Sequence, residues 1–374
     1  MTTTLLDGAR SLFDPLDTLA SARAEGEPVA PEALRHLADA GLVGLLVPKG
    51  AGGLELPLVE VADLYSEVAR ADGSTGWVFF VSDTCASYFG AYLPDEGLED
   101  VFADGVPSVA GQFSPEGTAR IDGEDLILNG DYRFGSGIVH ATWAGGGVMT
   151  VPDGDRAPEY LGACFPRAGA ELLGNWDVLG LQATASVDYR VREVRVPRSH
   201  TFDFLAPTVH RGSAVYALGA VALTAIGHSA WALGVTRRVL DELAAVAAET
   251  TRVGSPSSLA ASERFLYELG VLESRHRADR AWVYEVLAAA EAEALAGRAT
   301  AMTGTLMRAA CRHVNQDGAD IARQAYLLAG TGALRAGPIQ RAFRDLHAGS
   351  QHFYASPPQA SALGSAAVAG HAGA

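Results

Sequence analysis

Residues 175–197 read NWDVLGLQATASVDYRVREVRVP. From residue 186 to residue 196 apolar and polar side chains alternate, which is the pattern of a half-buried β-strand. Further short strand signals, separated by Gly and Pro, occur throughout residues 107–207. This part of the chain is therefore predicted to be a β domain, and its neighbours in the sequence decide the fold.

Helical patterns flank the β domain on both sides. Before it, residues 77–92 form a nearly all-apolar segment, and a helix that is apolar all round should be buried. After it we expect four long helices and then, from residue 358, a loosely held tail rich in Ala, Gly and Ser. The four helices are predicted at residues 213–248, 257–296, 300–329 and 338–351. The predicted domains are an N-terminal helical domain (1–106), a central β domain (107–207) and a C-terminal four-helix bundle (208–374).

Composition narrows the classes of partner. The chain has 374 residues, 48% of them hydrophobic, and a net charge of -16, which argues against nucleic acid or an anionic membrane as a partner. The longest apolar stretch, residues 214–226, is too short to span a bilayer, and no secretory signal is visible. Cys85, Cys164 and Cys311 are far apart, so we expect free thiols in a reducing cytoplasm. No pair of histidines has a metal-binding spacing, and we predict no metal site.

The domain order and several local motifs resemble the acyl-CoA dehydrogenase superfamily over about residues 15–365. The motifs are GLVGLLVPKGAGGLEL (41–56), ADGSTGWV (71–78), NGDYRFGSGIVHATW (129–143), the stretch quoted above, and GPIQRAFRDLHAGSQH (337–352). The resemblance implies an α+β protein with the acyl-CoA dehydrogenase fold: an N-terminal helical domain, a central β-barrel or sandwich and a C-terminal four-helix bundle. It also implies a homotetramer.

Within the superfamily, RFGSGIVHATW and RDLHAGSQH are most similar to the two-component flavin-dependent monooxygenases. That likeness implies reduced FMN or FAD supplied by a separate NAD(P)H:flavin reductase. It implies O2 as co-substrate, a C4a-(hydro)peroxyflavin, and a fairly apolar, aromatic or polycyclic small molecule as substrate. The sequence does not choose between FMN and FAD.

A missing carboxylate separates this branch from the dehydrogenases. Removal of an α-proton beside a thioester needs a positioned carboxylate, yet no Glu follows Glu293 and no acid occurs in residues 211–240. His352 stands near the place where the family has one such Glu. An imidazole can take a proton from a phenol or donate a hydrogen bond, so we predict His352 as a catalytic residue.

Glycine-rich and hydroxyl-bearing loops are the candidates for contact with the flavin ring. The family match gives Ser136 a catalytic role at the flavin N5/O4 edge, with Phe134 and Gly135 beside it. A second loop and a tryptophan are further candidates for ring contact: Gln112, Phe113, Ser114 and Trp176. Arg252, Thr331 and Gly332 are the candidates for the phosphate end. No GxGxxG opens a helix after a strand, so no nicotinamide-binding fold is predicted.

Two departures from the family pattern leave alternatives open. Ala183 and Ala185 stand where the family has glycines, and no His lies near residues 83–85, where several aromatic hydroxylases have one. The alternatives are a dehydrogenase-like flavoprotein with an unusual base and a flavin-free binding or assembly protein of the same fold.

Overall fold

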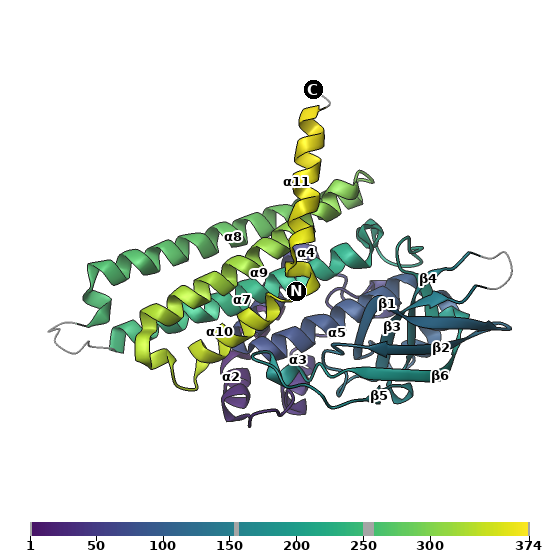
Figure 1. Cartoon of the computed structure of the whole chain (residues 1–374), viewed down its shortest axis with the longest axis horizontal. Coiled ribbons are helices and arrows are strands. Elements are labelled where there is room, and N and C mark those ends of the chain that lie inside the picture. Colours follow the sequence, from purple (N-terminus) through teal and green to yellow (C-terminus); the bar gives the residue numbers. More distant parts are fainter. Residues whose placement is uncertain (1, 153–156, 250–257, 373–374) are drawn as a thin grey trace.

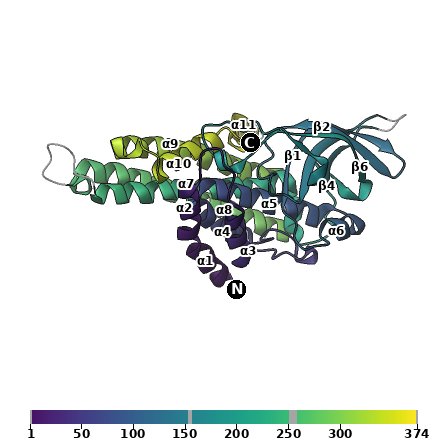
Figure 2. The ribbon, with the colours of Figure 1, turned by 90° about the horizontal axis from the view of Figure 1, so that it is seen from below.

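The computed structural model describes residues 2–152, 157–249 and 258–372. Helices, then a sheet, then helices follow one another along the chain, with the sheet at one end of the molecule and the far ends of α7 and α8 at the other (Figures 1 and 2). The N-terminal helices are α1 (Thr2–Ser11), α2 (Phe13–Ala22), α3 (Pro31–Asp39), α4 (Leu58–Ala71), α5 (Gly73–Tyr92) and α6 (Asp95–Val101). The predicted fold class is confirmed, and the domain limits after residues 106 and 207 stay a proposal.

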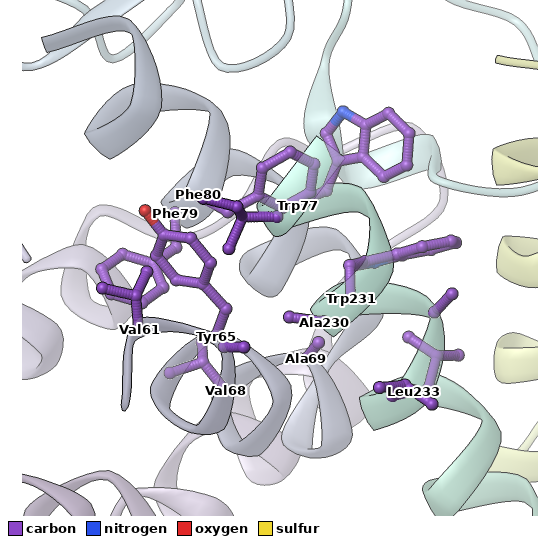
Figure 3. Close-up of a cluster of buried hydrophobic side chains, with 14 of the residues drawn as sticks. Val61, Tyr65, Val68, Ala69, Trp77, Phe79, Phe80, Ala230, Trp231 and Leu233 are labelled. Atoms are coloured by element: carbon purple, nitrogen blue, oxygen red, sulfur yellow. The ribbon is translucent and has the colours of Figure 1, made fainter. Parts of the chain in front are cut away.

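The central helix α5 begins at a side-chain cap and is buried along its length. The Asp72 carboxylate accepts a hydrogen bond from the Thr75 backbone N–H at 3.0 Å, which satisfies one donor of the first turn. Trp77 and Phe80 then pack against α4 and α7, as Figure 3 shows with Tyr65 and Trp231. The all-apolar helix is thus covered within this chain.

The described strands form one seven-stranded sheet, in the order β5-β6-β2-β1-β3-β4-β7. β1 and β3 pair in parallel and the other pairs are antiparallel. The register of β1 shifts between Gln112 and Gly117, which bends the strand where it passes α5. The strands are β1 (Val109–Asp122), β2 (Asp125–Tyr132), β3 (Trp143–Thr150), β4 (Tyr160–Pro166), β5 (Glu171–Leu172), β6 (Tyr189–Pro197) and β7 (Thr201–Asp203).

Four long helices follow the sheet, as predicted. They are α7 (Gly219–Glu249), α8 (Glu263–Leu295), α9 (Ala301–Ala329) and α10 (Pro338–Gly349). The apolar stretch judged too short for a membrane is longer than expected: Ala214–Glu249 could span a bilayer by length and composition. However, 78% of its most apolar window is buried inside the protein, which makes α7 the core helix of the bundle.

The expectation of a loosely held tail is wrong for the described residues. Residues Pro357–Ala372 form helix α11, which projects away from the body of the molecule (Figure 1). Its Ala-rich composition has high helix propensity, and this outweighs the glycines that suggested a tail.

Asp83, on α5, holds the loop that follows α3. Its carboxylate accepts hydrogen bonds from the backbone N–H groups of Leu45 and Leu46 at 2.8 and 2.9 Å and from the Tyr65 hydroxyl at 2.5 Å. Burial raises the pKa of this carboxyl. The acid is therefore a structural anchor for this loop.

Replacing Asp83 with Ala should lower the free energy of unfolding by about 3–5 kcal/mol, because three buried donors lose their acceptor. Urea denaturation followed by circular dichroism measures this loss. Asp95→Ala, at an exposed acid paired with Arg211, is the control and should cost less than about 1 kcal/mol. Equal losses in the two variants would contradict the anchoring role.

Candidate active site

A row of hydroxyl groups surrounds Ser136. The Ser136 hydroxyl accepts a hydrogen bond from the Trp77 indole N–H at 3.0 Å and shares one with the Ser186 hydroxyl at 2.7 Å. Ser186 in turn shares a hydrogen bond with Thr184 at 2.7 Å. These bonds join α5 to two loops of the β domain and fix the position of the Ser136 side chain.

His352 contacts the same Trp77 ring. The His352 and Trp77 ring centroids are 5.6 Å apart in an edge-to-face arrangement. The Tyr354 backbone N–H donates a long hydrogen bond, 3.4 Å, to His352 Nδ1. If that nitrogen accepts, the proton of the neutral ring is on Nε2, so His352 can present an N–H donor.

Burial keeps this imidazole uncharged at neutral pH. It lowers the pKa of His352 to about 4 and that of His228 well below its usual range. A neutral ring can donate a hydrogen bond or accept a proton in passing, but it does not carry a lasting charge. This refines the predicted role of His352.

His228 is a core residue, but one nitrogen of its ring has no partner in the described structure. Its ring, on α7, stacks on His352 with centroids 4.1 Å apart. Its Nδ1 is buried and has no hydrogen-bond partner among the described residues. The sequence could not predict that residues 228 and 352 are in contact. Periodicity shows which face of a helix is buried, but not which distant segment packs against that face.

Phe134 and Trp176 form a partly open aromatic surface near Ser136. Their ring centroids are 6.2 Å apart, and the Phe134 side chain is 56% exposed. The Trp176 indole N–H donates to the Leu181 carbonyl at 3.1 Å, which fixes the ring. An exposed flat apolar surface of this kind suits a planar cofactor.

In the second predicted flavin loop, only some of the candidate residues have side chains that are free to contact a ligand. Gln112 Oε1 is buried with no partner in the described structure, so it can accept a hydrogen bond from a ligand. Ser114 is exposed. Phe113 packs elsewhere: its ring stacks on Phe204 at 5.6 Å and meets Tyr88 on α5 edge-on, so its side chain is part of the core.

The predicted phosphate contacts are far from this surface within one chain. Thr331 and Gly332 are exposed between α9 and α10, at the end of the bundle opposite the sheet (Figure 1). Gly332 lies beside Val246 near the end of α7. Arg252 lies outside the described residues.

The loop around Ser136 fits a flavin edge. A Cβ at Gly135 would lie 3.0 Å from the Tyr189 ring, and one at Gly137 would lie 2.8 Å from Val78. Gly137 also has φ +73°, which favours glycine. Both positions are therefore packed against neighbouring side chains and require glycine, whereas the partnerless Gln112 oxygen and the exposed Phe134 ring are the groups free to meet a flavin.

The loop at residues 180–186 is held by α10. A Cβ at Gly180 would lie 2.0 Å from the Arg344 carbonyl oxygen, so only glycine fits. The Leu181 N–H donates to the buried Asp345 carboxylate at 2.6 Å, and burial raises the pKa of Asp345 to about 6. Arg341 of the same helix makes ion pairs with Asp17 at 2.8 Å and Asp72 at 3.7 Å.

No carboxylate takes the place of the missing base in the described contacts of the site. The rings that contact His352 belong to Trp77, His228 and Tyr354. Asp345 is buried, and one of its oxygens is taken by Leu181.

Comparison with known proteins identifies the family. Residues 7–95 match the N-terminal domain and residues 226–357 the C-terminal domain of acyl-CoA dehydrogenase. The chain is 28% identical to an indole-3-acetate monooxygenase of Acinetobacter baumannii, covering 87% of this chain and 84% of that protein. It is 26% identical to HsaA, the oxygenase subunit of a flavin-dependent monooxygenase of Rhodococcus jostii, covering 89% of each. XiaF from Streptomyces, solved with FADH2 and glycerol, superposes with a TM-score of 0.84 at 19% identity, covering 95% of this chain and 92% of that one.

The two domain matches together span more than half of the chain, which belongs to the acyl-CoA dehydrogenase superfamily. Within it, the chain groups with the flavin-dependent monooxygenases. The predicted family and branch are confirmed.

Of the two alanines that replace family glycines, Ala185 has φ +43°, which costs an L-residue free energy, whereas Ala183 has no positive φ. Ala185→Gly should therefore raise the free energy of unfolding by roughly 0.5–1 kcal/mol, and Ala183→Gly should lower it by a similar amount. Urea denaturation of the matched pair measures both. Stabilisation by neither, or by both, would contradict the backbone strain at Ala185.

Proposed function

We propose that this protein is the oxygenase component of a two-component flavin-dependent monooxygenase. It would use reduced FMN or FAD from a separate NAD(P)H:flavin reductase, and O2, to oxygenate a fairly apolar aromatic or polycyclic small molecule. The observation that carries the proposal is the site itself. The neutral His352 and the Ser136 hydroxyl row both contact Trp77, and the hydrogen bonds described for these two side chains involve no carboxylate.

Each residue has a distinct task in this scheme. Reduced flavin, when bound, supplies the electrons that activate O2. Ser136 and the backbone at Gly135 would hold the polar edge of the ring, and Gln112 Oε1 would accept a ring N–H. His352 would donate its Nε2–H to the oxygen being transferred. It would also accept the proton that the substrate releases.

The aromatic walls would protect the reaction from water. The rings of Trp77, His228 and Tyr354 contact His352, and Phe80 packs behind them against His228. A water-poor site limits proton leakage and the loss of activated oxygen as H2O2. The same flat walls favour a flat, apolar substrate.

The assembly and location of the protein are further proposals. We propose a homotetramer formed through the bundles, in which Arg252, Thr331 and Gly332 reach the cofactor phosphate of a neighbouring subunit. Apolar side chains exposed on α8, α9 and the following turn support this: Leu266, Tyr267, Leu327 and Leu334. The three described cysteines are buried free thiols, which suits a reducing cytoplasm.

His352→Ala should lower the yield of oxygenated product per reduced flavin by about tenfold or more, with a matching rise in H2O2, because the donor to the oxygen is lost. Single-turnover mixing of protein, reduced flavin and a phenol or indole probe with O2, followed by chromatography, measures the yield. The control is His347→Ala on α10, whose Nδ1 bonds the Phe343 carbonyl at 2.7 Å. An unchanged yield in His352→Ala would refute the catalytic role.

Ser136→Ala should weaken the binding of reduced flavin by about five- to tenfold, because one polar contact is lost and the Trp77 N–H loses its acceptor. Equilibrium dialysis under anaerobic conditions measures the affinity. Ser274→Ala, at an exposed serine on α8, is the control and should leave the affinity unchanged. Bleaching of bound oxidised flavin by an acyl thioester without a reductase would instead favour a dehydrogenase. Failure to bind any flavin would favour a binding protein.

A further inference from the structure

His228 has an unusual environment for a buried polar residue. The residue is 3% exposed, and its Nδ1 has no hydrogen-bond partner among the described residues. Burying an imidazole without a hydrogen bond costs free energy that an apolar side chain would not cost. No hydrogen bond from Nδ1 to the protein holds the ring in place. We therefore attribute its position to its contacts with neighbouring rings.

Those contacts converge on His352. The ring of His228 lies over two neighbouring rings at once, with centroid distances of 4.1 Å to His352 and 5.0 Å to Tyr354 and interplanar angles of 28° and 25°. The His352 and Tyr354 rings are nearly parallel to each other, at 5°. One face of His228 therefore covers the pair.

Two rings from α5 also contact His228. Trp77 and Phe80 meet it edge-on at 4.9 and 4.8 Å. The backbone of α7 is also fixed here, because Asn315 on α9 donates to the His228 carbonyl at 3.2 Å. The imidazole is thus clamped between a rigid helix and the segment that carries His352.

His352 has few restraints of its own. It lies just after α10 ends at Gly349, and the hydrogen bond to its ring, from the Tyr354 N–H, is long at 3.4 Å. The next residue, Phe353, is 60% exposed. A side chain on such a segment needs an external surface to define its plane.

We propose that His228 is a positioning residue for His352: its flat face fixes the plane of the His352 imidazole and so directs the Nε2–H toward the reacting oxygen. This inference rests on the proposed function, because it assigns His228 an effect only through His352. The part that acts is the face of the ring, which distinguishes the proposal from a role in hydrogen bonding.

Two apolar replacements of His228 distinguish the effect of a flat ring from the effect of side-chain volume alone. His228→Phe keeps a flat ring without nitrogens, whereas His228→Leu fills the space without a flat face. With reduced FMN and O2 but no substrate, the measured quantity is the delay before the absorbance of oxidised flavin appears in stopped flow. We expect His228→Leu to shorten this delay about fivefold and His228→Phe to stay within about twofold of the unmodified protein. Equal losses in both variants would overturn the proposal, because the nitrogens and not the plane would then matter.

A double-mutant cycle tests whether His228 acts through His352. In the His352→Ala background, adding His228→Leu should change the delay by less than about twofold, since residues that act as one unit are non-additive. Additive losses would show an independent packing effect and would overturn the proposal. The cycle also covers the case in which His228→Phe is too large to fold, because it needs only the Leu variant.

A second buried histidine supplies the control. His276 on α8 is 5% exposed and its Nδ1 also lacks a partner in the described structure. His276→Leu should lower the melting temperature without shortening the delay, and a shortened delay would show that any buried replacement has the same effect. If the unmodified protein gives no delay relative to free reduced FMN, the proposed oxygenase function fails. If His352→Ala leaves the delay intact, the catalytic assignment fails.

Discussion

The structure depends on the burial of one helix that has no polar face. Because α5 is apolar almost all round, it must be covered on every side, and no single domain of this chain can do so. The α4 and α7 helices cover one side and the sheet covers another. Covering α5 brings together three segments that are far apart in the sequence. The candidate site forms where they meet, at Trp77.

Trp77 shows how packing and chemistry share the same side chain. Its ring contacts His228, Trp231 and His352, while its indole N–H reaches Ser136 in the β domain. A residue that fills the core therefore also sets the separation between the two groups assigned to catalysis. The hydroxyl row and the imidazole pair are held by the same interior that holds the domains together.

Much of this arrangement could be predicted from the sequence. The strand alternation before Pro197, the helical spacing after residue 211 and the local motifs predicted the order of elements and the family. The structure places both His352 and Ser136 in contact with Trp77. The stack of His228 on His352 could not be predicted, because residues on α7 and after α10 meet only through tertiary packing. The α11 helix was missed because small residues fit both a flexible tail and a helix, and composition does not separate them. Thr331 and Gly332 lie between α9 and α10, at the end of the bundle opposite the sheet, and a local motif does not report such a separation in space.

The sheet has a consequence for how copies of this protein can meet. Its outermost strands, β5 and β7, are only two and three residues long. Such short edges offer few unpaired backbone groups to a strand from another molecule, which protects against edge-to-edge aggregation. This agrees with the proposed association of copies through their helical surfaces, which would leave the β domain free for the proposed flavin site.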